Sequence, residues 1–411
     1  MRKLLTGNSA AAWGARLSDV DYLPVFPITP QTEIIETLAE WVDKGELNAR
    51  LTTLESEHSM LTAAGAAAAT GVRVFTATSS QGLLYAMEML YNVAGWRVPL
   101  VLVNVSRGLS APITLEPDHN DILAARDSGF LQLHCATCQE VLDSVVLAYR
   151  LAEDKRVRLP VLVNLDGFYL SFTREPVEIP SQEQVRAFLP PFDPGSNRFR
   201  GGEPVSQAVA VLGGGPYSYF RYQAHLAALE AVQAFDELGE KFGECFGRSF
   251  PAIEAYRCED AEILFVMIGS FATKAREAVD RLRDDGQKIG LLRPRLLRPF
   301  PAEELARLLS GKAGVAVVDQ NLSNGLGGIL HAELSAALYH LPKRPLLVSF
   351  IGGLGGRDIT AGEFYAMVGQ VRQAVAKGQP PPPRLLFTEQ ELKGMRGLQN
   401  IASGKGASHD A

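Results

Sequence analysis

The feature that most constrains the fold of this sequence is a regular alternation of short apolar runs with longer amphipathic or small-residue runs. In the first half the strand-like runs are YLPVF (22–26), RLTTL (50–54), VRVFTAT (72–78), PLVLVNV (99–105), FLQLHC (130–135) and PVLVNL (160–165). Strands that alternate with helices of this length form βαβ units and a parallel sheet. Because the strands are continuously apolar, we expect the sheet to be covered on both faces.

The pattern loosens from about residue 178 and then resumes. A connection rich in proline, glycine and polar residues leads into a helical stretch that includes FRYQAHLAAL (220–229). A second series follows, with expected strands at 262–269, 289–294, 313–319 and 345–352. The sequence therefore predicts an α/β protein with two tandem, doubly wound parallel-sheet domains.

We place the first domain with its linker at 1–255 and the second at 256–378. A proline-rich spacer and a C-terminal arm occupy 379–411, with one helical piece, TEQELKGMRGL, and an end, SGKGASHDA, expected to be disordered. A proline spacer before a short helix suits an arm that reaches another subunit, and a frayed terminus is the alternative.

Composition narrows the class of protein. The chain has 411 residues, 46% of them apolar, which is ample for buried cores. The net charge is −6 and no basic patch stands out, so neither nucleic acid nor an anionic membrane is an expected partner. No apolar run reaches the roughly 18 residues of a membrane span. The start, MRKLLTGNSAAAWG, is interpreted as a strand and a helix rather than a signal peptide.

Four cysteines in a chain of this length do not form a disulfide framework, and a cytoplasmic location is expected. Cys135 and Cys138 form a C-x-x-C pair, which could be half a zinc site or a redox pair. Because no second ligand pair accompanies it, we favour an incidental pair. The string DHND (118–121) could ligate a metal, but neighbouring loop residues rarely all face one ion. No metal site is therefore predicted in this chain.

Four loops follow the carboxyl ends of successive expected strands, where ligands bind in open α/β sheets. They cover residues 26–33, 54–59, 78–83 and 105–121. Together they carry a carboxylate, an arginine, several hydroxyls and two glycines: Glu57, Arg107, Thr29, Ser79, Ser80, Gly82 and Gly108. This set indicates a ligand site on one rim of the first sheet. The residues alone leave open that these are ordinary helix caps and turns.

The nucleotide and hydrolase fingerprints are missing from the sequence. No G-x-G-x-x-G follows a strand, no G-x-x-x-x-G-K-[ST] occurs, and no G-x-S-x-G elbow is found.

A set of longer strings resembles the α subunit of the multi-subunit 2-oxoacid:ferredoxin oxidoreductases, the group that includes pyruvate:ferredoxin oxidoreductase. The strings are FPITPQTEIIE (26–36), ESEHSMLTAAGAAAATG (55–71), TSSQGLLYAMEML (78–90), RGLSAP (107–112), DHNDILAARDSGFLQL (118–133), QEVLDS (139–144), DGF (166–168), FRYQAH (220–225), FGRSF (246–250), YRCEDAEI (256–263), LLRPF (296–300) and IGGLGGRDIT (351–360). Each is weak alone, but the ordered set covers nearly the whole chain and is specific.

The resemblance implies a thiamine diphosphate enzyme that oxidatively decarboxylates a 2-oxo acid to an acyl-CoA. The first domain would hold the aminopyrimidine ring of the cofactor, and the second would resemble the C-terminal domain of transketolases. A β subunit would supply the diphosphate and Mg²⁺ site and a [4Fe-4S] cluster, and γ and ferredoxin-like δ subunits or their equivalents would complete the electron path. A dimer of catalytic units is expected. The chain itself has no C-x-x-C-x-x-C run for a cluster.

The family motif places its essential glutamate at Glu57, whose carboxyl would face N1′ of the aminopyrimidine ring. The start of a helix favours the charged form of this carboxyl, whereas burial against an apolar ring favours the neutral form. A group balanced in this way can share a proton with the ring. Pro27, Ile28, Ser80 and Gly82 are the further cofactor contacts implied. Glu55 lies two residues off the motif and is expected to be a helix-start or surface charge.

A 2-oxo acid carries a carboxylate, and the resemblance assigns Arg107 and Thr29 to bind it. A guanidinium can bind a carboxylate through two parallel hydrogen bonds, which a lysine cannot. A structural ion pair is the alternative role for Arg107. Where relatives read something like SAPINIW, this chain reads SAPITLEP (110–117), a change that includes Thr114, Glu116 and Pro117. We therefore expect a substrate bulkier than pyruvate, such as the aromatic acid phenylglyoxylate.

Two other assignments stay open at this stage. One is the E1β-type subunit of a 2-oxo acid dehydrogenase complex, which shares the domain order and the glutamate chemistry. The other is a structural subunit without catalytic function. The 2-oxo acid, the final electron acceptor and the binding place of coenzyme A are not determined by the sequence.

Overall fold

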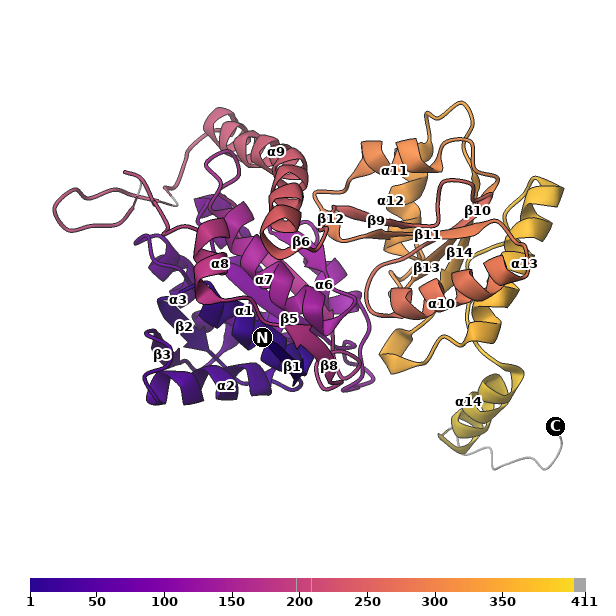
Figure 1. Cartoon of the computed structure of the whole chain (residues 1–411), viewed down its shortest axis with the longest axis horizontal. Coiled ribbons are helices and arrows are strands. Elements are labelled where there is room, and N and C mark those ends of the chain that lie inside the picture. Colours follow the sequence, from indigo (N-terminus) through magenta and orange to yellow (C-terminus); the bar gives the residue numbers. More distant parts are fainter. Residues whose placement is uncertain (197, 208, 403–411) are drawn as a thin grey trace.

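The computed structural model describes residues 1–196, 198–207 and 209–402, which form two lobes in chain order (Figure 1). The first lobe contains a sheet with strand order β12-β6-β7-β5-β4. Its strands from the first half of the chain are mutually parallel: β4 (Phe75–Thr78), β5 (Val101–Ser106), β6 (Leu131–His134) and β7 (Val161–Asp166). A bridge from Tyr22 to Val74 joins this sheet to the parallel pair β2 (Tyr22–Val25) and β3 (Arg50–Thr53).

Helices cover both faces of this sheet, as the continuously apolar strands require. The helices of this lobe are α1 (Gly7–Leu17), α2 (Thr32–Asp43), α3 (Glu57–Ala68), α4 (Ser80–Tyr85), α5 (Met87–Trp96), α6 (Asn120–Ala124), α7 (Cys138–Ala152), α8 (Gln182–Phe188) and α9 (Gly214–Phe246). The first strand, β1 (Arg2–Leu5), stands apart from the sheet and pairs antiparallel with β8 (Glu175–Glu178). The expected N-terminal strand and helix are therefore present, but this strand does not extend the sheet.

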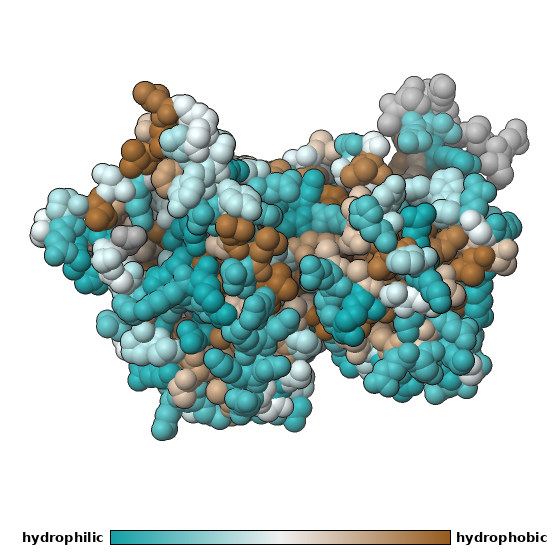
Figure 2. All heavy atoms as spheres, turned by 90° about the horizontal axis from the view of Figure 1, so that it is seen from above, coloured by the Kyte–Doolittle hydropathy of each residue, from teal (hydrophilic) through white to brown (hydrophobic). Residues whose placement is uncertain are grey.

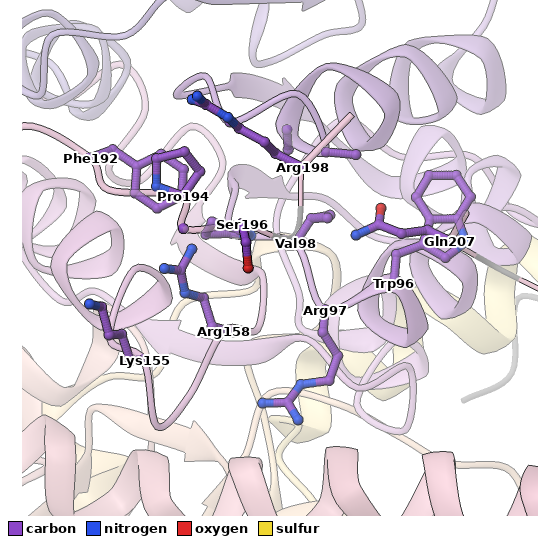
Figure 3. Close-up of a pocket in the computed structure, with 15 residues that line it drawn as sticks. Trp96, Arg97, Val98, Lys155, Arg158, Phe192, Pro194, Ser196, Arg198 and Gln207 are labelled. Atoms are coloured by element: carbon purple, nitrogen blue, oxygen red, sulfur yellow. The ribbon is translucent and has the colours of Figure 1, made fainter. Parts of the chain in front are cut away.

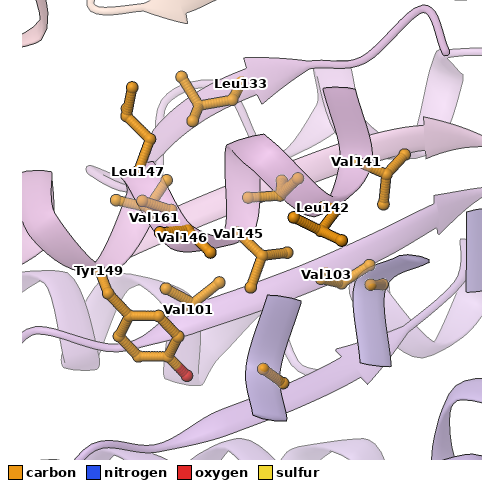
Figure 4. Packing of buried hydrophobic residues seen from close by; sticks show 14 of the residues in the cluster. Val101, Val103, Leu133, Val141, Leu142, Val145, Val146, Leu147, Tyr149 and Val161 are labelled. Atoms are coloured by element: carbon orange, nitrogen blue, oxygen red, sulfur yellow. The ribbon is translucent and has the colours of Figure 1, made fainter. Parts of the chain in front are cut away.

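The core of the first lobe forms where α7 lies across the parallel strands (Figure 4). The helix begins at Thr137, whose side chain accepts a hydrogen bond from the backbone N–H of Glu140. Its apolar side chains pack on the valines of β5 and β7, and nearly all of them are buried. The hydroxyl of Tyr149 donates to the carbonyl of Val74 at 2.8 Å, so its one polar atom is satisfied inside the core.

The second lobe is a sheet with strand order β15-β14-β13-β10-β11-β9. Its strands are β9 (Ile253–Tyr256), β10 (Ile263–Val266), β11 (Ile289–Pro294), β13 (Gly314–Asp319), β14 (Leu346–Ile351) and β15 (Arg384–Leu385). All pair parallel except β9, which runs antiparallel to β11. The helical elements are α10 (Phe271–Asp284), α11 (Ala302–Leu309), α12 (Ile329–Leu338), η1 (Leu354–Gly356), α13 (Ala361–Lys377) and α14 (Glu389–Ala402).

The predicted α/β class with two tandem parallel sheets is confirmed. Each of the two sheets also has one edge strand that pairs antiparallel with its neighbour. The domain limits 1–255, 256–378 and 379–411 stay a prediction. In the C-terminal arm, β15 pairs with β14, and the guanidinium of Arg357 holds Glu391 of α14 through two hydrogen bonds of 2.8 Å. The segment 403–411, expected to be disordered, lies outside the described residues.

One short strand ties the lobes together. β12 (Leu296–Arg298) follows β11 in the second half of the chain but pairs antiparallel with β6 of the first sheet. The space-filling view shows brown apolar residues gathered at the middle of the molecule, between the two lobes (Figure 2). One hydrophobic cluster accordingly includes residues of both halves, such as Leu102 and Leu297.

A buried ion-pair cluster also spans this junction. Glu140, in the first turn of α7, contacts Arg293 at 2.5 Å and Arg295 at 2.9 Å. Arg293 also contacts Glu254 of β9 at 2.5 Å. Burial alone would raise the pKa of Glu140, but the two guanidinium groups lower it to about 2. The junction is therefore held by charges that are paired within the chain.

No helix within the part of the chain that the structure covers is both long enough and apolar enough to cross a membrane.

Candidate active site

Glu57 is the first residue of α3 and is buried, with 5% of its surface exposed. The helix begins there because Ser56 caps it, accepting a hydrogen bond from the backbone N–H of Ser59. The Glu57 carboxyl lies against α4: a Cβ atom added to Gly82 would be 2.4 Å from its Oε1. Only glycine leaves room for the carboxyl at this point. Glu55, by contrast, is exposed and hydrogen-bonds Ser59, which is the surface role expected for it.

Arg107 is the buried cation of this rim, with 7% of its surface exposed. Its Nη1 donates to the carbonyl of Thr29 at 2.8 Å, and its Nη2 donates to Gln81 Oε1 at 2.8 Å. Its Nε has no hydrogen-bond partner among the described residues. Burial lowers the pKa of Arg107, and the nearby Asp121 carboxylate only partly offsets this effect. A buried guanidinium that pairs with no carboxylate of the described residues is suited to receive a carboxylate from a ligand.

The loops that the sequence singled out do converge. Gln81, which holds Arg107, directly precedes Gly82, which touches Glu57. The hydroxyl of Ser80 donates to the carbonyl of Gly108 at 2.9 Å and joins the third loop to the fourth. Glu57, Gly82, Ser80 and Arg107 therefore share one rim at the carboxyl ends of β4 and β5.

Thr29, Pro27 and Ile28 lie at the edge of this rim. Thr29 reaches Arg107 through its backbone carbonyl, while the residue itself is exposed. Pro27 is exposed and Ile28 is half-buried, so both remain accessible to a ligand. Ser80 is buried and adopts a left-handed backbone conformation, with φ at 50°. Such a conformation is uncommon for a residue other than glycine, and it occurs frequently at functional sites.

Asp121 also belongs to this site. The sequence analysis considered it only as part of the string DHND, as a metal ligand, and did not favour that role. Its buried carboxylate accepts hydrogen bonds from the backbone N–H groups of Ser80 (3.0 Å), Arg107 (3.2 Å) and Ile122 (2.7 Å), from Ser106 Oγ (2.6 Å) and from Asn104 Nδ2 (3.1 Å). Burial raises the pKa of Asp121, although these donors act against that effect. Asp121 therefore fixes both rim loops by hydrogen bonding. The sequence offered one signal for this role, because DHND lies in a loop that follows the end of an expected strand.

The neighbouring His119 joins the rim to the second lobe. Its Nε2 is 2.7 Å from Asp166 Oδ1, and both side chains are fully buried. The other oxygen of Asp166 accepts from the N–H and the hydroxyl of Ser270, at 2.8 and 2.5 Å. Burial acts to lower the pKa of His119, but the Asp166 carboxylate outweighs it and the pKa is raised. The rim is thus braced by a buried polar chain that runs between the lobes.

Cys135 and Cys138 are buried free thiols. Burial raises the pKa of Cys135 to about 12, which disfavours the reactive thiolate. Across 1–196, 198–207 and 209–402, no group of three histidine, cysteine, aspartate or glutamate side chains is placed to hold a metal ion.

The rim has features that fit the aminopyrimidine side of thiamine diphosphate. The Glu57 carboxyl could face a ring nitrogen, and Gly82 keeps the space beside it free of a side chain. The buried hydroxyl of Thr78, next to this space, and that of the following residue, Ser79, have no partner within the described ranges. Buried polar atoms normally have partners, so these groups point to a ligand.

Comparisons with known proteins agree with this interpretation. The family model described as "Pyruvate flavodoxin/ferredoxin oxidoreductase, thiamine diP-bdg" matches residues 14–242, and "Pyruvate:ferredoxin oxidoreductase core domain II" matches 261–364. The pyruvate synthase subunit PorA of Methanothermobacter thermautotrophicus is 45% identical over 366 residues, covering 89% of this chain and 94% of that protein. The ketoisovalerate oxidoreductase subunit VorA of Pyrococcus horikoshii is 40% identical, covering 92% and 96%.

A solved structure supports the fold. The 2-oxoglutarate:ferredoxin oxidoreductase from Magnetococcus marinus superposes with a TM-score of 0.70 at 21% identity, over 91% of this chain and 65% of that one. A split gene transketolase superposes with a TM-score of 0.52 at 14% identity. The predicted likeness to both folds is confirmed.

The first family model covers more than half of the chain, and the relatives match along nearly its whole length. The oxidoreductase assignment therefore replaces the E1β-type alternative. In this family the iron–sulfur clusters belong to other subunits, in agreement with the missing cysteine motif. The chain belongs to the family of α subunits of the thiamine diphosphate-dependent 2-oxoacid:ferredoxin oxidoreductases.

Proposed function

We propose that this chain provides the proton-sharing carboxyl and the substrate-carboxylate site of an enzyme that converts a 2-oxo acid to an acyl-CoA and carbon dioxide. Electrons pass to iron–sulfur clusters in partner subunits. One observation carries the proposal. Gly82 lies against the Glu57 carboxyl, and the residue before it, Gln81, accepts a hydrogen bond from Arg107. A proton-sharing carboxyl and a carboxylate-binding guanidinium lie on one rim, as the chemistry requires.

Each rim residue has a definite task in this proposal. Bound thiamine diphosphate supplies the electron sink for cleavage of the carbon–carbon bond. Glu57 holds a proton at its carboxyl and shares it with the facing ring nitrogen. Arg107 orients the substrate by its carboxylate, and the Thr29 carbonyl and Gln81 fix the guanidinium in place. Pro27, Ile28, Ser80 and Gly82 are the proposed cofactor contacts.

The proposed assembly has this chain beside a β subunit that holds the diphosphate, Mg²⁺ and a cluster. Further γ-type and δ-type subunits carry the remaining clusters, and coenzyme A accepts the acyl group. The relatives support a multi-subunit enzyme, since each is named as one subunit of its complex.

For the substrate we propose a 2-oxo acid bulkier than pyruvate, with phenylglyoxylate as one candidate. The support comes from the loop 110–117 beside Arg107. Gly108 N–H donates to the Glu116 carbonyl at 3.0 Å, which folds this loop back on itself next to Arg107. Ile113 and Leu115 are 76% and 47% exposed on it and offer aliphatic surface to a larger side chain. The relatives include enzymes named for pyruvate and for ketoisovalerate.

The test is an anaerobic assay of the complex that copurifies with this chain. Thiamine diphosphate, Mg²⁺ and coenzyme A are added, and a panel of 2-oxo acids is offered with a viologen dye as electron acceptor. We expect dye reduction, with a branched or aromatic acid giving a higher kcat/KM than pyruvate. A preference for pyruvate over every bulkier acid would contradict the substrate proposal alone. Absence of dye reduction in a complex that contains thiamine and iron would overturn the redox function.

Glu57→Ala separates a catalytic subunit from a structural one. We expect it to abolish turnover, whereas the control Glu55→Ala, two residues away and exposed, leaves turnover unchanged. Unchanged turnover in Glu57→Ala would mean that this chain has only a structural role.

A further inference from the structure

A pocket lies at the opposite end of the first sheet from the rim (Figure 3). Its volume is about 500 Å³. The ends of α3 and α5, the loop after α7, and Phe192, Pro194, Gly195, Ser196, Arg198 and Gln207 line it. Val98 and Pro99, just before β5, lie in its wall, whereas the rim follows the other end of β5. A strand of six residues spans about 20 Å, so a ligand here would not touch the reacting groups.

The lining carries four cations and no carboxylate: Arg97, Lys155, Arg158 and Arg198. Figure 3 shows that the three arginines belong to different segments around the pocket. Lys155 has one acidic neighbour, Asp193, at 3.4 Å. None of the three arginines forms an ion pair with a carboxylate of the described residues. The pocket therefore carries an excess of positive charge.

Arg97 shows most clearly that this charge is not neutralised within the chain. Its Nη2 donates to the carbonyl of Val157 at 2.7 Å, and its buried Nε has no partner in the described part of the chain. Burial lowers the pKa of Arg97, and no neighbouring carboxylate counters that effect among the residues described. A partly buried cation without a counter-ion is unfavourable unless an anion comes from outside.

Helix dipoles do not remove the excess. The C-termini of α3, α5 and α7 point toward this region, and each is equivalent to about −0.5 charge. Asp193 adds one negative charge, so the four positive side chains of the lining still outnumber these negative ends.

The rest of the lining is suited to hold a ligand in one orientation. Arg158 donates to the carbonyl of Asp193 at 2.7 Å, and its guanidinium lies 5.0 Å from the centre of the Phe192 ring. These contacts fix the guanidinium before any ligand arrives. The indole Nε1 of Trp96 is a buried donor with no partner inside the described ranges. The pocket thus combines cations held by the chain, a buried donor without a partner and aromatic surface.

We propose that this pocket binds a small anion that carries two or more phosphate groups. Arginine side chains present several donors that match phosphate oxygens, and the residual charge of the pocket suits a multiply charged anion. Inorganic pyrophosphate and a nucleoside diphosphate share this chemistry. The nucleotide would add contacts of its base with Trp96 or Phe192.

The test is calorimetric titration of the assembled complex with ADP and, separately, with pyrophosphate, after saturation with thiamine diphosphate, Mg²⁺ and coenzyme A. We expect saturable binding with one site per copy of this chain. Arg97→Ala and Arg158→Ala should each weaken it at least tenfold. The control Arg156→Ala, which removes an exposed guanidinium paired with Asp154 and Glu237, should leave it unchanged. Lys155→Ala is a second, milder variant, because this side chain is largely exposed.

Tighter binding of ADP than of pyrophosphate would show that the base contributes, and equal affinities would show that the phosphates alone are recognised. Each variant must retain wild-type turnover, which shows that it folds and assembles. The proposal is overturned if neither probe binds, or if both bind equally well to Arg97→Ala, Arg158→Ala and the wild type.

Discussion

Two buried arginines of this protein differ in what surrounds them. Arg293, at the junction of the lobes, contacts the carboxylates of Glu140 and Glu254 at 2.5 Å each. Arg107, on the rim, contacts a backbone carbonyl and an amide oxygen, and no carboxylate of the described chain lies within ion-pair distance. Burial acts to lower the pKa of both arginines, but the two carboxylates reverse this for Arg293, whose pKa is raised.

The comparison shows how to distinguish a structural ion pair from a binding residue. At the junction the chain supplies both charges, so the interaction is complete in this chain. On the rim the chain supplies only the cation, and no carboxylate of the described residues pairs with it, which supports the role proposed for Arg107 in binding a substrate carboxylate. The surroundings of Arg107 therefore do not favour a structural ion pair.

The largest effect is expected from breaking the junction. Glu140→Gln leaves Arg293 and Arg295 buried with one counter-charge fewer, which should lower the free energy of unfolding by about 3–5 kcal/mol. Urea denaturation of the purified complex or chain measures it. The control Glu304→Gln, an exposed partner of Arg307, should change stability by less than about 0.5 kcal/mol. Equal effects of the two variants would contradict the assignment.

The same carboxyl predicts a pH dependence. The pKa of Glu140 is about 2 in the fold and near its ordinary value of 4.5 in the unfolded chain. Because the folded pKa is the lower one, its contribution of roughly 3 kcal/mol is complete above pH 4.5 and is lost as the pH falls toward 2. Wild-type stability should therefore fall more steeply than that of Glu140→Gln below about pH 4.5. Parallel curves would show that Glu140 does not carry this dependence.

On the rim, Gly82→Ala should cost about 100-fold in kcat, because its Cβ would lie 2.4 Å from Glu57 Oε1 and displace the carboxyl. Steady-state kinetics of the complex measures this loss. Gly95→Ala, in α5, is the matched control, since an added Cβ there meets nothing within 4 Å. An active Gly82→Ala enzyme would mean that the Glu57 carboxyl does not need its present position.

Arg107→Lys should raise KM for the 2-oxo acid about tenfold, with a smaller change in kcat. Lysine keeps the charge but cannot bind a carboxylate through two parallel hydrogen bonds. Kinetics with the best substrate of the panel gives both constants. Arg281→Lys, on the surface of α10, serves as the control. If KM stays at the wild-type value, the substrate carboxylate is bound elsewhere.

The smallest effect is expected at the polar chain between rim and second lobe. Ser270→Ala removes the hydroxyl that donates to Asp166 at 2.5 Å but retains the backbone donor, so stability should fall by about 1–2 kcal/mol. Thermal unfolding measures it, with the exposed Ser335→Ala as reference. A loss no greater than the reference would indicate that Asp166 is held adequately by His119 and the backbone.

The sequence by itself determined the parallel sheets, because strand and helix patterns depend on local spacing of apolar residues. It also brought Glu57, Gly82, Ser80 and Arg107 to one rim, since the loops after parallel strands share an edge. The ordered family strings identified the cofactor chemistry of this chain.

Only the tertiary structure decided the features that depend on contacts between distant segments. β12 crosses to the first sheet although its three residues are too few to show a periodicity. Asp121 fixes both rim loops, and Ser270 meets Asp166 across 104 positions of sequence. The pocket around Arg97 likewise combines segments that lie far apart in the chain. Such contacts arise when the elements pack, and no local pattern encodes which partners will meet.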